Sequence, residues 1–154
     1  MGDIGVNEIK ETIEKHIKIT GKKPVVVIDY IQILAPIDIK ASDKQNMDKT
    51  VLELKRMTRD FKISIIGISA LNRASYKDAI GMDAFKESGA IEYGSDVLIG
   101  LQLKGAGEKS FNVDEAKARN PRQIELVILK NRNGATGKKL DYEYYPLFNY
   151  FNEI

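Results

Sequence analysis

Cysteine is absent from the 154-residue chain, which also has no tryptophan and only one histidine. The absence of cysteine excludes disulfides and thiolate metal sites, and one histidine argues against a zinc site built from protein ligands. No segment approaches the roughly 18 consecutive apolar residues that a membrane-spanning helix needs. Residues 1–5 lack a basic region followed by an apolar one, so no secretory signal is predicted. We expect a cytoplasmic protein with no membrane partner, with which the lack of cysteine is compatible.

A phosphate-binding loop of the pattern Gly-x-x-x-x-Gly-Lys-Ser/Thr is also missing. The chain contains two Gly-Lys pairs, at 21–22 and 137–138, and neither is followed by a hydroxyl residue. His16 and Arg132 stand where the first glycine of such a loop would have to be. The chain therefore lacks the glycine-rich backbone that cradles phosphates in many nucleotide-binding proteins.

The composition suits one globular domain with a core of its own. Hydrophobic residues make up 43% of the chain and charged residues 30%. The formal net charge is only +2. This mild basic excess is short of what a protein that coats DNA would carry, so any contact with nucleic acid must be local.

The most informative segment is the run of four β-branched residues at 25–28, which ends in Asp29. Such a run predicts a strand that is buried on both faces, as in a parallel sheet. In an open α/β sheet, ligands bind at the carboxyl ends of the strands. A carboxylate at that place can hold the water shell of a Mg²⁺ ion that bridges nucleotide phosphates. Asp29 is therefore a candidate magnesium and nucleotide residue.

Hydrophobic periodicity predicts the remaining elements. Apolar residues at helical spacing indicate a helix over about 8–18, capped by Asn7, and a second amphipathic helix over 47–61 after a loop at 35–46. Further strands are predicted at 63–69, 97–103 and 124–129, with a short helical piece near 114–117 and a closing antiparallel hairpin at 140–144 and 148–151. Strand, helix and strand in this order form a βαβ unit, so the first two strands are expected to be parallel, with the second also buried.

Five segments, taken in order, resemble the motor domain of DnaB-type hexameric replicative helicases, a branch of the RecA-like ATPases. They are residues 25–32, 69–73, 85–92, 95–99 and 129–137. The resemblance implies an α/β fold: a partial RecA-like, P-loop NTPase domain over 1–154, with a mostly parallel sheet flanked by helices. It covers only the second half of the family's motor domain. The phosphate-loop half would precede Met1, so this chain alone is not expected to hydrolyse ATP.

The resemblance assigns nucleotide contacts to three residues. Asp29 matches the family's Walker B aspartate, which orders Mg²⁺, usually through water. Ser69 and Asn72 match a motif beside the γ-phosphate of ATP. The family has glutamine at the position of Ala70, and a methyl group cannot form the hydrogen bond with which that glutamine senses phosphate. The sensing role is therefore expected to have moved to Ser69, Asn72 or Arg73.

Two further groups of residues match functional motifs of the family. Lys86, Glu87 and Gly89, with Arg73 beside them, match the loop that grips single-stranded DNA in the central channel. Lys130 and Arg132 match a Lys-x-Arg pair that reaches the nucleotide of the neighbouring subunit, and Arg132 would be the arginine finger. Because side chains alternate along an extended segment, residues 130 and 132 are expected to share a face.

We therefore interpret the chain as part of an ATP-dependent replicative DNA helicase. By resemblance, its partners are ATP, Mg²⁺, single-stranded DNA, further copies of itself in a hexameric ring, and a primase. Two alternatives remain at this point. One is a non-catalytic module that binds single-stranded DNA or a partner ring, which the alanine at position 70 and the missing loop favour. The other is a RecA-like recombinase or regulatory ATPase.

Overall fold

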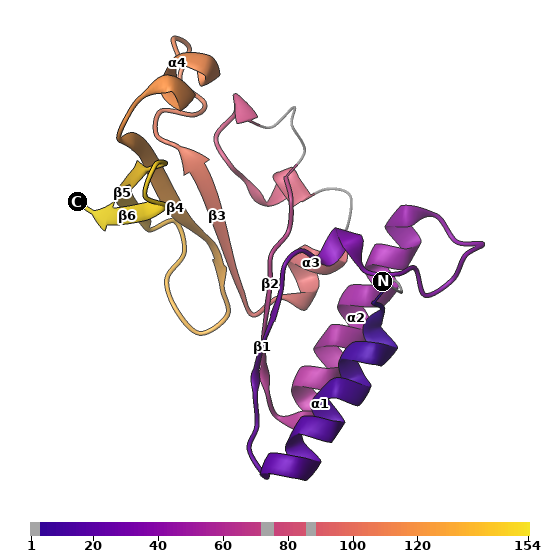
Figure 1. Ribbon diagram of the computed structural model, residues 1–154. Helices are drawn as coiled ribbons and strands as arrows, with labels where there is room; N and C mark the ends of the chain where they lie inside the picture. Colours follow the sequence, from indigo (N-terminus) through magenta and orange to yellow (C-terminus); the bar gives the residue numbers. More distant parts are fainter. Residues whose placement is uncertain (1–3, 72–75, 86–88) are drawn as a thin grey trace. The chain divides into compact units, whose positions relative to one another are not determined.

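The computed structural model describes residues 4–71, 76–85 and 89–154, and the chain divides into two compact units (Figure 1). The first unit spans Met1–Ala70 and Glu87–Gly94, and the second spans Leu71–Lys86 and Ser95–Ile154. In the part of the chain that is described, no helix has both the length and the apolar character needed to cross a membrane.

The first unit is the predicted βαβ arrangement with two added helical pieces. Its elements are α1 (Val6–Thr20), β1 (Val25–Ile28), η1 (Ile31–Ile33), α2 (Asp43–Phe61), β2 (Ser64–Gly67) and α3 (Gly89–Gly94). β1 and β2 pair in parallel, from Val25 opposite Ser64 to Ile28 opposite Gly67. The predicted parallel pairing of these two strands is confirmed.

The ends of both long helices differ from the predicted ones. α1 begins after Gly5, not at Asn7, because the Glu8 carboxylate accepts a hydrogen bond of 2.9 Å from the Gly5 backbone N–H. α2 begins at Asp43, inside the predicted loop 35–46. Ser42 and Gln45 form a capping box there, with each side chain accepting a hydrogen bond from the backbone N–H of the other. The apolar spacing marks the core-facing stripe of a helix and misses its polar first turn.

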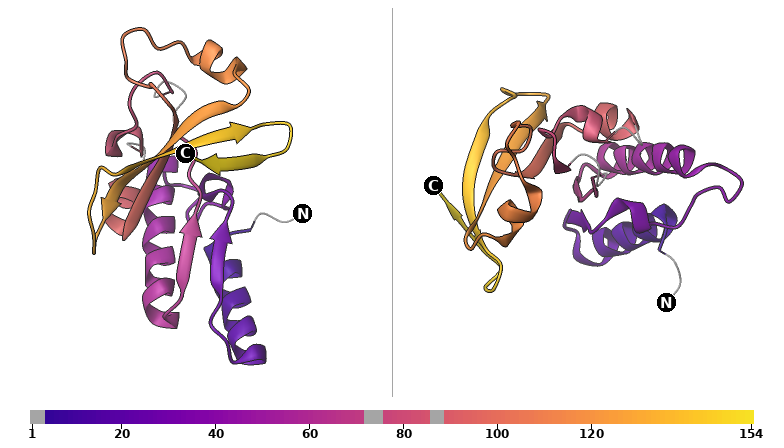
Figure 2. Two further views of the ribbon diagram at one scale, coloured as in Figure 1. Left: turned by 90° about the vertical axis from the view of Figure 1, so that its left-hand side faces the viewer. Right: turned by 90° about the horizontal axis from the view of Figure 1, so that it is seen from above.

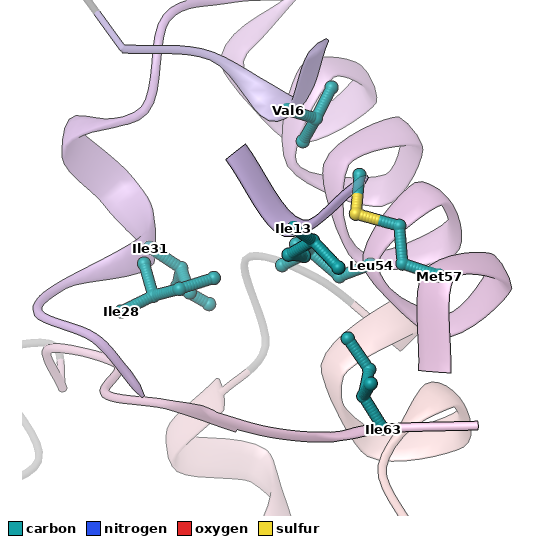
Figure 3. Packing of buried hydrophobic residues seen from close by; sticks show 7 residues of the cluster. All are labelled: Val6, Ile13, Ile28, Ile31, Leu54, Met57 and Ile63. Atoms are coloured by element: carbon teal, nitrogen blue, oxygen red, sulfur yellow. The ribbon is translucent and has the colours of Figure 1, made fainter. Parts of the chain in front are cut away.

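The core of the first unit lies between the two long helices and one face of the two-stranded sheet (Figure 3). Its buried members come from every layer: Val6, Ile13, Ile28, Ile31, Leu54, Met57 and Ile63. α1 and α2 run side by side over this core (Figure 2).

The prediction that both strands of this sheet are buried on two faces is wrong for the described chain. Val26 and Ile28 turn toward the helices, whereas Val25 is 64% exposed and Val27 is 62% exposed. On β2, Ile66 is 55% exposed. An apolar run shows that a strand can be buried on both faces, and whether it is depends on what packs against each face.

The second unit is an antiparallel sheet with the strand order β3-β4-β5-β6. Its elements are η3 (Met82–Phe85), β3 (Val97–Leu103), α4 (Val113–Ala118), β4 (Arg122–Asn131), β5 (Lys139–Tyr145) and β6 (Tyr150–Glu153). Figure 2 shows the β5–β6 hairpin at one edge of this sheet. The predicted hairpin, short helix and α/β class are confirmed. Parallel pairing is confined to β1 and β2 among the described strands.

Candidate functional site

Asp29 and Ser69 both lie at the carboxyl-end tip of the parallel strand pair. Asp29 directly follows β1 and its side chain is exposed, and Ser69 comes two residues after β2. The backbone stays paired beyond the strands, because the Ile68 N–H donates to the Ile28 carbonyl and the Ile31 N–H donates to the Ile68 carbonyl, each at 2.9 Å. The sheet therefore brings the two predicted nucleotide residues to one place.

The structure adds Gln32 to this tip, a residue for which the sequence analysis predicts no chemical role. Its side-chain Nε2 donates to the Ser69 hydroxyl oxygen at 2.9 Å and to the Ala70 carbonyl at 3.2 Å. Its Oε1 accepts from the Ala70 N–H at 3.3 Å. One amide side chain thus ties the segment after β1 to the segment after β2. The sequence signal that could have pointed to Gln32 is its position three residues after Asp29 in the same motif.

The tip has a donor set that suits a magnesium ion bound mainly by a nucleotide. Mg²⁺ in nucleotide sites keeps several waters and uses one or two protein carboxylates beside the phosphate oxygens. Asp29 supplies one exposed carboxylate, and the Ser69 hydroxyl lies on the neighbouring strand end. In the described residues, no three or more His, Cys, Asp and Glu side chains gather as a metal-binding group. A single exposed carboxylate such as that of Asp29 suits an ion that is held mainly through water.

Several other predicted residues lie outside the described part of the chain. They are Asn72, Arg73, Lys86 and Glu87. Gly89 is described, is half-buried, and begins α3. Among the described residues, a Cβ added at Gly89 would meet the Tyr93 ring at 3.8 Å, which is an ordinary van der Waals contact.

The segment that leads toward the predicted DNA-contacting residues is seated on the antiparallel sheet. Its Ile80 N–H donates to the Gln102 side-chain oxygen at 2.7 Å. Gln102 donates in turn to Glu125 at 2.6 Å, and Lys139 donates to the same carboxylate oxygen at 3.1 Å. Glu125 is only 7% exposed, so these two donors satisfy a carboxylate that burial would otherwise destabilise.

Two glycines let this segment approach the sheet closely. The Ile80 side chain lies where a Cβ at Gly100 would stand. Gly107 has a φ of +92° and donates its N–H to the Lys77 carbonyl at 2.9 Å. At the start of the segment, the Lys117 ammonium lies 5.1 Å from the centre of the Tyr76 ring. These contacts fix the backbone of residues 76–80 within the second unit.

Lys130 and Arg132 lie at the end of β4 in the second unit. Lys130 is opposite Leu98 in the register and is half-buried. Arg132 follows the strand and is exposed, and its Nε lies 3.2 Å from the Asp96 Oδ1. Both basic residues therefore lie where the end of β4 runs beside the start of β3. Sequence analysis found the two basic residues and missed the contact of Arg132 with Asp96.

Comparison with known proteins gives one family for nearly the whole chain. The model of the DnaB-like helicase C terminal domain matches residues 1–153. A probable replicative DNA helicase of Trieres chinensis is 26% identical over 155 residues, which is 96% of this chain and 33% of that protein. The replicative DNA helicase DnaB of Leifsonia xyli is 31% identical over 73% of this chain and 24% of its own length. The replicative DNA helicase DnaB of Mycoplasma pneumoniae is 30% identical over 88% of this chain and 29% of its own length.

Solved structures show the same fold. One is an ATPase domain with a TM-score of 0.80 and 24% sequence identity. The match covers 99% of this chain and 52% of that domain. Another is a DnaB-like replicative helicase described with its interactions with primase, with a TM-score of 0.76, 23% identity and 34% of that chain covered. The α/β fold is therefore that of RecA-like helicase ATPase domains. The chain spans 24% to 33% of the length of these three curated relatives.

Proposed function

The chain belongs to the DnaB-like helicase C-terminal domain family, and we propose that it forms the second half of the ATP-driven motor domain of a replicative DNA helicase. One observation carries the proposal most directly: Asp29 and Ser69 both lie at the carboxyl ends of two paired parallel strands, where open α/β sheets bind ligands. The relatives named replicative helicases favour this function over a recombinase or a purely binding module.

In the proposed motor, each ATP site is shared between two subunits. One subunit contributes a phosphate loop together with Asp29, which holds Mg²⁺ through water, and with Ser69 and Asn72 near the γ-phosphate. The neighbouring subunit contributes Lys130 and Arg132. Bound Mg²⁺ would neutralise charge on the phosphates, and Arg132 would stabilise the charge that develops on the transferred phosphoryl group.

The exposed apolar face of the parallel pair supports a motor domain of which this chain is one half. Val25, Val27 and Ile66 are each more than half exposed, although all three are strongly apolar. Apolar surface of this kind gains free energy when another layer covers it. The chain also covers only 52% of the solved ATPase domain to which it is similar. We propose that the phosphate-loop half covers this face.

The proposed DNA contacts are Lys86, Glu87, Gly89 and Arg73, in a channel formed by a hexameric ring of subunits. A lysine attracts the phosphate backbone without reading its sequence, and a glycine lets backbone N–H groups approach a phosphate. The segment 76–80, which precedes Lys86 and Gly89 in the chain, supports this role because its own backbone is held on the antiparallel sheet. We also propose that the motor acts in DNA replication in the cytoplasm and that a primase is one of its partners.

The experiment compares the chain of residues 1–154 with an extended chain, meaning the same residues joined to a phosphate-loop half at the N-terminus. We expect residues 1–154 alone to show no ATP turnover. In the extended chain, Arg132→Ala should leave ATP binding near normal and lower kcat by on the order of 10³ or more. Lys138→Ala is the matched control and should change little, because Lys138 is an exposed basic residue in the same connection between β4 and β5.

Two outcomes would contradict the proposal. One is turnover by residues 1–154 that Asp29→Ala abolishes, because the missing phosphate loop would then be unnecessary. The other is a loss of ATP binding as large as the loss of turnover in the Arg132→Ala chain, because a finger acts on the transition state.

A further inference from the structure

A β-bulge in β4 decides which face of the antiparallel sheet carries the basic pair. Leu98 pairs with Lys130, but Ile99 pairs with Ile128, so Leu129 is an extra residue on β4. Opposed residues of antiparallel strands share a face, and neighbours along a strand alternate. Lys130 therefore lies on the face of Leu98, whereas a strand without the bulge would place it on the face of Ile128.

The two faces of β3 differ in what covers them. Leu98 is 8% exposed, and Gly100, which alternates onto the same face, is covered by the Ile80 side chain. Ile99 and Leu101, on the other face, are 51% and 52% exposed. The bulge thus turns the basic pair away from the exposed apolar face and onto the face that carries the seated segment 76–80.

Asp96 is the residue that meets Arg132 on this face. The Arg132 N–H donates to the Asp96 carbonyl at 2.8 Å, which extends the ladder one step beyond the pair of Val97 and Asn131. The Arg132 Nε lies 3.2 Å from the Asp96 carboxylate, and each side chain is 54% exposed. An ion pair this exposed contributes little to folding. A backbone bond and a side-chain contact between the same two residues do, however, restrict where the guanidinium can point.

The atom used in this contact suits an arginine that must still bind phosphate. A guanidinium is a planar fork with one N–H on Nε and two on each Nη. Arginine recognises phosphate best in a bidentate way, with two parallel N–H donors. An acid that contacts Nε orients the plane of the fork from its stem. A contact with both Nη atoms would compete with phosphate directly.

We propose that Asp96 is a positioning residue for the arginine finger: it holds Arg132 by Nε, on the face selected by the Leu129 bulge, so that its Nη groups meet the nucleotide of the neighbouring subunit. The purpose assigned to Asp96 rests on the proposed function, whereas the contact itself does not. The two parts are therefore tested separately.

The contact is tested on residues 1–154 by NMR of the arginine Nε–H groups. Asp96→Asn keeps the size of the side chain and removes its charge, so the Arg132 Nε–H should exchange with water several-fold faster. Arg59 provides a matched control, because its Nε lies 3.0 Å from the Asp60 carboxylate. Asp60→Asn should alter the Arg59 signal and leave that of Arg132 unchanged. An Arg132 signal that does not respond to Asp96→Asn overturns the proposal.

The positioning role is tested in the extended chain by a double-mutant cycle. Asp96→Asn should lower kcat by about 10- to 100-fold, as expected for a misplaced catalytic group, with little change in the KM for ATP. In an Arg132→Ala background the same substitution should cost nothing further. Asp141→Asn removes a comparable exposed partner, that of Lys104 on the same sheet, and should leave turnover unchanged.

Other results of the cycle count against the proposal. An equal loss in both backgrounds would mean that Asp96 supports the fold only, and a rise in turnover on Asp96→Asn would mean that the acid restrains the finger. If Arg132→Ala itself leaves turnover intact, the proposed finger fails, and with it the purpose of Asp96, even where NMR shows the contact.

Discussion

Replacing Gly100 by alanine tests how tightly the segment 76–80 is seated on the antiparallel sheet. The new Cβ would lie 2.6 Å from the Ile80 Cδ1, 3.0 Å from its Cγ2 and 3.1 Å from its Cγ1. Three atoms of one side chain are involved, so a small rotation of its end cannot relieve the contact. Ile80 is only 9% exposed, and its backbone N–H is bonded to Gln102. The segment therefore has to shift.

The expected cost is that of overpacking a buried site, about 1–3 kcal/mol in the free energy of unfolding. Ile80→Ala on its own should cost about 2–5 kcal/mol, because it removes a large buried side chain. The double variant should cost less than the sum of the two, by roughly the overpacking energy, because the alanine at position 80 no longer meets the new methyl group. Urea unfolding followed by circular dichroism measures all three.

Gly89→Ala is the control for the general effect of adding a methyl group, because among the described residues its Cβ would meet an aromatic carbon of Tyr93 at 3.8 Å, an ordinary contact distance. It should change stability far less than Gly100→Ala. The reasoning is refuted if Gly100→Ala costs as much in the Ile80→Ala background as it does in the natural sequence, because the cost would then have another source.

Three further predictions concern the first unit. Gln32→Ala removes the acceptor of the Ala70 N–H, so the Ala70 amide should exchange with solvent about 2- to 12-fold faster, as expected for the loss of a hydrogen bond of ordinary net strength. Amides within β2 serve as the internal control. Unchanged exchange of the Ala70 amide would show that the Gln32 side chain does not form this hydrogen bond. The hydrogen bond from Lys49 holds the pKa of the Asp38 carboxyl below its usual range. Because this folded-state pKa is depressed, the contribution of the pair to stability is present above the usual aspartate pKa and is lost as the pH falls through the depressed value. Lys49→Met should raise the Asp38 pKa, which a carbon-13 NMR titration measures. An unchanged titration curve would contradict the role of Lys49. Finally, residues 1–154 should self-associate at high concentration through the exposed apolar face and the strand edges of the parallel pair. Light scattering measures this association, and Val27→Thr should reduce it. A monomer at high concentration without the substitution would count against the prediction.

Local patterns in the sequence were enough to place most helices and strands. The apolar stripe of α2 was found because a helix repeats every 3.6 residues. Its first turn, from Asp43, was missed because that turn is polar and is defined by the capping box of Ser42 and Gln45. The βαβ order also predicted the parallel pairing of β1 and β2 correctly, because right-handed crossovers leave few alternatives.

The candidate site divides in a similar way. Asp29 could be proposed from sequence because a carboxylate at the end of a β-branched run has a defined place in an open sheet. Gln32 and Asp96 could not, because their roles depend on partners from other strands: Gln32 bonds to residues 37 and 38 positions away in the chain. No local period in the sequence signals such a contact.

The sequence by itself determined where the chain forms helices and strands and which chemical groups stand at the strand ends, because periodicity and residue type act over a few neighbouring residues. Only the tertiary structure decided which groups meet and which faces are covered. The single extra residue Leu129 reverses the face of Lys130 and Arg132, and helices cover one side of β1 while Val25 and Val27 stay exposed on the other. Both features arise from hydrogen-bond register and packing between distant segments, which local residue patterns do not encode.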